Sequence, residues 1–140
     1  MARPKLEDVL ALVPMFRDLS RRQLKHLASF CEVADYMAGA SVVKKGDTGD
    51  AFYVVLTGQA KVVDGRKFLV RMLPGDHFGE IAVIDGGPRT ATVITETPST
   101  LVILSRKNFR QAMLADPELA YHMMSEIAKM FRRVSASTTS

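Results

Sequence analysis

The chain has 140 residues but only one cysteine, no tryptophan and no long apolar run. The single cysteine, Cys31, excludes an intrachain disulfide, and its helical, apolar context predicts a small buried residue in a reducing cytoplasm rather than a reactive thiol. No apolar run approaches the roughly 20 residues that cross a bilayer. The first residues also lack the cleavage site of a signal peptide. We therefore expect a cytoplasmic location and no membrane partner.

The patterns of common catalytic and metal sites are also missing. The three histidines, His26, His77 and His122, lie in different predicted elements without the spacing of metal ligands. The motifs GxxxxGK(S/T), HExxH, GxSxG and CxxC do not occur. An enzyme built on a small cupin-like barrel would need a histidine cluster inside the barrel. We predict that the protein is not an enzyme and binds no metal.

The charge is mildly basic, with 19 lysines and arginines against 15 acids and a net charge of +4. Basic residues that bind nucleic acid gather in patches and are interleaved with aromatic residues. Here they occur as scattered pairs along the chain that are not interleaved with aromatic residues. We expect no direct nucleic-acid binding by this domain.

Helical periodicity is confined to the two ends of the chain. Apolar residues at i, i+3, i+4 and i+7 predict a short helix between Leu6 and Val13. Ser20 and Gln23 form a capping-box pattern at the start of a second helix. Near the C-terminus, Ser105 is expected to cap a helix that ends near Leu114, and Asp116 another that begins at Pro117.

Between these helices the pattern is that of short strands. Val, Ile, Phe and Tyr dominate, and Gly, Pro and Asp separate the segments. Asp64-Gly65 predicts a two-residue hairpin of type I′. We predict an α+β protein, with an antiparallel β-roll (a jelly-roll-like barrel), N-terminal helices and two C-terminal helices. The expected strands are Glu32–Met37, Ser41–Lys44, Ala51–Thr57, Gln59–Val63, Lys67–Met72, Thr92–Glu96 and Thr100–Leu104.

The stretch Phe78–Val93, FGEIAVIDGGPRTATV, carries the chemistry. Gly79 lets the backbone approach a ligand closely because it has no Cβ. Glu80 can accept a hydroxyl proton, and Arg89 can offer a fork of donors to an anion. The pair suits a small ligand with both a hydroxyl and a negative charge. The alternative is an ordinary surface ion pair across a turn.

This string, F-G-E-(I/L)-A followed by P-R-(S/T)-A-T, resembles the phosphate-binding cassette of cyclic-nucleotide-binding domains, the family of the catabolite activator protein and the regulatory subunits of protein kinase A. The resemblance runs from about Phe16 to Phe131 and includes K-G-D-x-G-D-x-F-Y-V-V-x-x-G around Lys45–Gly58. It implies one such domain over residues 1–134, and we expect a disordered tail over 135–140.

The resemblance implies a role for each residue of the cassette. Glu80 would bind the ribose 2′-hydroxyl and Arg89 the cyclic phosphate. Backbone groups of the small or apolar positions would add bonds to the phosphate, Thr90 would add a hydroxyl beside the arginine, and Phe78 opens the motif. The backbone positions are Ile81, Ala82 and Ala91.

The resemblance implies cyclic AMP as the ligand, with cyclic GMP as the alternative. Thr90 and the strand residue Arg71 match positions that cyclic-GMP-dependent kinases use on guanine, but many bacterial cyclic-AMP binders also carry P-R-(S/T)-A-T. Arg71 can equally be a solvent-facing strand residue.

The last two helices are expected to form a lid that passes ligand occupancy to a downstream effector or a second copy of the chain. Met123, Met130 and Phe131 are candidates to reach the base, or else pack on the barrel. Other hypotheses are a DNA-binding regulator truncated before its helix-turn-helix, the regulatory part of a larger enzyme or channel, and an interaction module without a ligand.

Overall fold

The computed structural model describes residues 4–79 and 82–139. Eight strands form two four-stranded antiparallel sheets, in the orders β1-β8-β3-β6 and β2-β7-β4-β5. The strands are β1 (Glu32–Tyr36), β2 (Ser41–Val43), β3 (Ala51–Thr57), β4 (Ala60–Asp64), β5 (Lys67–Met72), β6 (His77–Phe78), β7 (Thr92–Thr95) and β8 (Ser99–Ser105).

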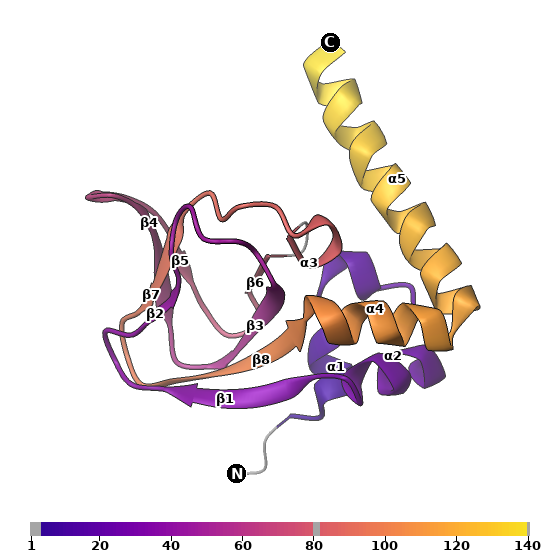
Figure 1. Ribbon diagram of the computed structural model, residues 1–140, viewed down its shortest axis with the longest axis horizontal. Helices are drawn as coiled ribbons and strands as arrows, with labels where there is room; N and C mark the ends of the chain where they lie inside the picture. The colour runs from indigo at the N-terminus through magenta and orange to yellow at the C-terminus, as the bar shows by residue number, and fades with distance from the viewer. Residues whose placement is uncertain (1–3, 80–81, 140) are drawn as a thin grey trace.

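The helices gather at one end of this roll (Figure 1). Helices α1, α2 and α4 lie together beside the ends of β1 and β8, α3 sits above them, and α5 rises away from the roll. They are α1 (Leu6–Leu10), the 3₁₀ turn η1 (Pro14–Phe16), α2 (Arg21–Ala28), α3 (Ala82–Asp85), α4 (Arg106–Ala115) and α5 (Pro117–Thr139). The α+β class, the antiparallel roll and the helices at both ends are confirmed.

Local signals explain where most elements begin. Ser20 Oγ accepts from Gln23 N–H at 3.1 Å while Gln23 Oε1 accepts from Ser20 N–H at 2.9 Å, which completes the predicted capping box. Ser105 Oγ caps α4 through Asn108 N–H at 3.1 Å. The first helix is shorter than predicted because Pro14 cannot donate a helical hydrogen bond, and the chain turns into η1 instead.

One turn differs from the sequence expectation. The β4–β5 loop consists of Gly65 and Arg66, and only Gly65 has a positive φ, +62°. That pattern belongs to a type II′ turn rather than type I′. Helix α5 continues to Thr139, whereas residues 135–140 were expected to form a disordered tail. Serine, alanine and threonine can extend a helix that is already nucleated, because each added residue gains a hydrogen bond. The domain limits stay a prediction.

The core consists of two clusters. The larger one joins the helices to one face of β3 and β8, and includes Phe16, Phe52 and Leu104. The smaller one lies inside the roll around Tyr53, Val55 and Leu101. Strand β3 is buried at six consecutive positions because it contributes to both clusters. The cassette segment packs against this buried strand.

Candidate functional site

Arg89 is the central side chain of the predicted site. It is 8% exposed, and its Nη2 donates to the carbonyl of Ala51 at 2.8 Å. Its guanidinium lies 5.7 Å from the centre of the Tyr53 ring. Among the described residues, no carboxylate lies within ion-pair distance of Arg89. A buried cation is costly unless an anion pairs with it, so this geometry suits an anionic ligand.

Gly79 makes this placement of Arg89 possible. Its φ is +88°, and a Cβ there would lie 2.6 Å from the Ala51 carbonyl oxygen and 2.7 Å from Arg89 Nη1. Any other residue would be strained and would displace the guanidinium or strand β3. Gly79 also accepts a helical bond from Val83 N–H at 3.0 Å, which begins the single turn of α3.

Two stacked aromatic side chains lie next to Gly79 and Arg89. Strand β6 pairs Phe78 with Tyr53 of β3, and their rings stack with centroids 4.8 Å apart. Burial raises the pKa of the Tyr53 hydroxyl, while the nearby Arg89 cation partly opposes this shift. Sequence analysis missed β6 because two residues are too few to show an alternating pattern.

The loop that precedes β3 holds the Arg89 segment through backbone hydrogen bonds. Arg89 N–H donates to the Asp47 carbonyl at 2.8 Å, and Gly46 N–H donates to the Arg89 carbonyl at 2.9 Å. Gly49 N–H donates to the Gly87 carbonyl at 2.8 Å. The sequence analysis quoted this Gly-Asp-x-Gly-Asp string as part of the resemblance but assigned it no role beyond a turn. Only the tertiary structure brings it against the cassette.

A cavity of about 610 Å³ lies in front of this segment. One wall is apolar and comes from the sheet β2-β7-β4-β5, with Val62, Val70 and Met72 among its residues. The opposite wall is the cassette segment. The predicted site residues that line the cavity are Phe78, Gly79, Ala82, Arg89, Thr90 and Ala91. The cassette wall also includes Asp85, whose carboxylate accepts from Gly87 N–H at 2.8 Å. An apolar wall facing the Arg89 guanidinium suits a ligand with a flat apolar part and an anionic part.

Three predicted site residues are not placed at this cavity. Glu80 and Ile81 lie outside the described residues. Arg71 pairs with Lys61 of β4, next to the pair of Val70 with Val62. Because successive residues of a strand face opposite sides, Arg71 lies on the outer face, where it donates to Glu96 at 2.6 and 3.1 Å. A role for Arg71 at the base stays a prediction.

The candidates for contact with a base on the last helix also lie elsewhere. Met123 is 2% exposed and belongs to the larger core cluster, while Phe131 is 72% exposed. None of Met123, Met130 and Phe131 is among the residues that line the cavity. For Met123 the packing alternative of the sequence analysis is therefore the observed one.

Within the described residues, no group of three or more histidine, cysteine, aspartate and glutamate side chains could hold a metal ion. No helix among them is long and apolar enough to cross a membrane.

Comparison with known proteins identifies the fold and the domain family that the sequence predicted. The family model described as cyclic nucleotide-binding domain matches residues 33–116. The chain belongs to the cyclic nucleotide-binding domain family. Its similarity to that family covers both sheets, the cassette segment and α4.

Individual relatives are regulatory proteins by name. The chain is 27% identical over 135 residues to the CRP-like cAMP-activated global transcriptional regulator of Mycobacterium tuberculosis, covering 93% of this chain and 60% of the regulator. It is 33% identical over 108 residues to the cAMP-dependent protein kinase regulatory subunit of Schizosaccharomyces pombe, covering 76% and 26% of the two chains. The chain thus spans between a quarter and three fifths of these proteins.

A solved structure, the N-terminal domain of a transcriptional regulator from Streptomyces coelicolor A3(2), superposes with a TM-score of 0.87 at 27% identity. The match covers 94% of this chain and 95% of that one.

Proposed function

We propose that the domain is a cyclic-nucleotide sensor, not an enzyme, and that it binds cyclic AMP in the cavity in front of the cassette. The observation that carries the proposal is the buried Arg89 guanidinium, which faces this cavity without a carboxylate partner among the described residues. A cyclic phosphate carries the single negative charge that a guanidinium binds through its fork of donors. Glu80 takes the ribose 2′-hydroxyl, as the family resemblance implies.

The neighbouring residues complete the binding site in this proposal. Thr90 offers a hydroxyl beside Arg89, and the backbone of Ile81, Ala82 and Ala91 donates to the phosphate. The base lies against the apolar wall of Val62, Val70 and Met72.

The outer-face position of Arg71 supports cyclic AMP over cyclic GMP. Its guanidinium is held by Glu96, so the strand wall of the cavity presents Val70 and Met72 to the base instead of a cation. A guanine would find few polar partners there, and unpaired buried polar groups weaken binding. The name of the Mycobacterium tuberculosis relative, a cAMP-activated regulator, points the same way.

Occupancy is passed on through α4 and α5 in this proposal. Helix α3 contains cassette residues and contacts α4, and α4 contacts α5. The exposed residues Tyr121, Met124, Phe131 and Val134 give α5 an uncovered apolar surface for a second copy or an effector domain. Ligand can shift α5 only if its affinity differs between two positions of these helices. A wider role as the sensing part of a transcription regulator, or of a larger enzyme or channel, is the alternative to an independent sensor.

Isothermal titration with cyclic AMP and cyclic GMP tests the proposal directly. We expect cyclic AMP to bind more tightly. Arg89→Ala should weaken binding by about 30-fold to several thousand-fold, because it leaves a buried phosphate charge unpaired, at about 2–5 kcal/mol. Arg66→Ala removes an equal charge from the exposed β4–β5 turn and should leave the affinity unchanged. Absence of heat with both nucleotides would refute the sensor, and unchanged binding by Arg89→Ala would refute the site.

A further inference from the structure

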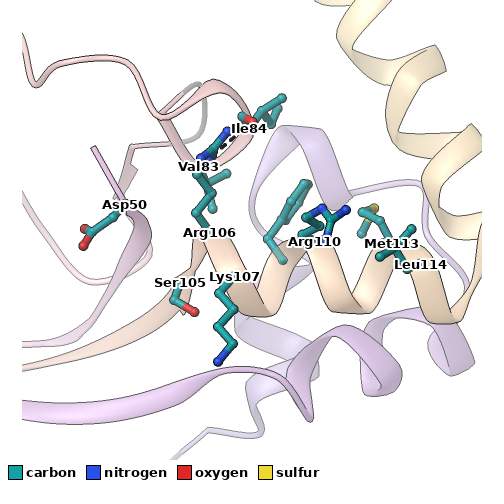
Figure 2. A pocket seen from close by; sticks show the side chains of 10 residues that line it. Asp50, Val83, Ile84, Ser105, Arg106, Lys107, Arg110, Met113 and Leu114 are labelled. Carbon is teal, nitrogen blue, oxygen red and sulfur yellow. Dashed lines mark hydrogen bonds between the residues drawn. The ribbon is translucent and has the colours of Figure 1, made fainter. Parts of the chain in front are cut away.

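A second hollow, separate from the cassette cavity, lies between α3 and α4 (Figure 2). We call it the α3–α4 groove, and its volume is about 790 Å³. Its floor is apolar, with Val83 and Phe109 at 1% and 7% exposure. Its rim carries Ile84 and Leu114, which are 37% and 65% exposed. Exposed aliphatic side chains beside a buried apolar floor indicate a surface that another molecule can cover.

Basic side chains of α4 line this groove. Arg106 and Arg110 are one helical turn apart and both line it, as does Lys107. Arg106 reaches across to α3, where its Nε donates to the Ile84 carbonyl at 3.5 Å (Figure 2). In the described part of the chain, neither Lys107 nor Arg110 has a carboxylate within ion-pair distance. Of the described lining residues, only Asp50 is acidic.

We propose that the α3–α4 groove binds an acidic amphipathic helix of a partner protein. Apolar side chains of that helix would cover Val83, Phe109 and Leu114, while its carboxylates would contact Arg106 and Arg110. From Ser105 to Leu114 the groove follows α4 for roughly 14 Å, which matches two to three turns of helix at 1.5 Å per residue. Such helix-in-groove docking is a common mode of peptide recognition.

Charge and spacing select this occupant over two others. If a second copy offered α5, its exposed Arg132 and Arg133 would meet the cations of the groove, and like charges repel. A fatty acid has one carboxylate and can neutralise only one of the two arginines. Carboxylates at i and i+4 of a helix repeat at the same spacing as Arg106 and Arg110.

The test uses the full chain without nucleotide, so its result does not depend on cyclic-nucleotide binding. The probe is a fluorescein-labelled 16-residue peptide with leucines at i, i+3, i+4 and i+7 and glutamates beside them, and the matched peptide carries lysine for glutamate. We expect the acidic peptide to raise the anisotropy and the lysine peptide not to. Raising the salt from 50 to 200 mM should weaken binding several-fold.

Charge reversals locate the contact. Arg110→Glu should weaken acidic-peptide binding at least tenfold and Leu114→Ser several-fold, while Arg66→Glu on the distant turn should change it less than twofold. Thermal melts establish that each variant is folded, and Lys107→Glu serves as a second reversal if Arg110→Glu melts early.

Several results would overturn the proposal. These are equal binding of both peptides, no binding of either, or an unchanged affinity in Arg110→Glu. Binding of dodecanoate but not of the peptide would assign the groove to a lipid anion. Self-association in sedimentation that Arg110→Glu abolishes would assign it to a second copy.

Discussion

At the scale of single residues, the position of Arg89 in the cassette depends on a glycine, Gly79. Arg89 can lie against β3 only because Gly79 has no Cβ, and the two residues are ten positions apart in sequence. The loop at Asp47 and Gly49 then fixes the backbone around Arg89. The cation is therefore held in position by the protein itself before any ligand arrives, which lowers the cost of ordering on binding.

Gly79→Ala tests whether the close approach of Arg89 to Gly79 matters for binding, apart from the backbone strain that any alanine at a positive φ causes. Gly39→Ala is the matched control, because Gly39 also has a positive φ, +82°, but nothing within 4 Å of its Cβ position. Both substitutions should cost about 1 kcal/mol of unfolding free energy from backbone strain. Gly79→Ala should cost more, because its Cβ would also lie 2.6 Å from the Ala51 carbonyl oxygen. Only Gly79→Ala should also weaken cyclic-AMP binding by tenfold or more in calorimetry. Equal affinities for the two variants would contradict the role given to Gly79.

Cys31 should be unreactive in the folded protein. Burial raises the pKa of its thiol from 9.0 to about 12, which leaves a roughly thousandfold smaller thiolate fraction near pH 8. We expect labelling by a chromogenic disulfide reagent at pH 8 to be slow in buffer and fast in urea. An unfolded thiol ionises near pH 9 while the folded one stays protonated, so this residue lowers stability as the pH rises above 9. Rapid labelling of the folded chain would contradict the protection of the half-buried Cys31 thiol.

At the scale of elements, the short helix α3 lines both the cassette cavity and the α3–α4 groove. Ala82 lines the cassette cavity, whereas Val83 and Ile84 line the α3–α4 groove. A nucleotide that shifts α3 would therefore move one wall of the groove, and by linkage a groove ligand would change the nucleotide affinity by the same factor. Helix α4 would follow such a shift through Arg106, whose Nε donates to the Ile84 carbonyl of α3.

Movement of α5 can be followed with one engineered fluorophore, because the chain has no tryptophan. Phe131→Trp replaces an aromatic side chain that is 72% exposed. If α5 moves toward the roll or a second copy on ligand binding, cyclic AMP should shift the emission to shorter wavelength. The same variant with Arg89→Ala should show no shift at equal nucleotide concentration. An emission spectrum unaffected by saturating cyclic AMP would contradict a relay through the end of α5.

At the scale of the whole molecule, ligand binding should raise the free energy of unfolding and the melting temperature. A nucleotide at 100 times its dissociation constant that binds only the folded state adds about 2.7 kcal/mol. For a domain of this size that corresponds to a rise in melting temperature of roughly 10 °C. Differential scanning calorimetry should show this rise with cyclic AMP and a smaller one with cyclic GMP. A shift that survives in Arg89→Ala would place the nucleotide somewhere other than the cassette cavity.

Features that depend on residues close together in the sequence were predicted, and features that depend on distant residues were not. The capping box at Ser20 and the cap at Ser105 were predicted because each depends on residues three apart. The strand segments followed from composition and turn residues, but β6 has only two residues and no pattern of its own. The register that turns Arg71 outward depends on the pairing of β4 with β5 and a bulge between Val62 and Val63, which strand propensity does not specify.

By itself, the sequence determined most of the elements, the α+β class and the cassette string, because capping, alternation and motif spacing are local properties of the chain. The tertiary structure decided which face each side chain occupies. It buried Arg89 against Ala51, set the Asp47 loop beside it, turned Arg71 toward Glu96 and opened a groove beside α4. These outcomes depend on contacts between residues distant in sequence, and such contacts exist only when the sheets and helices are packed together.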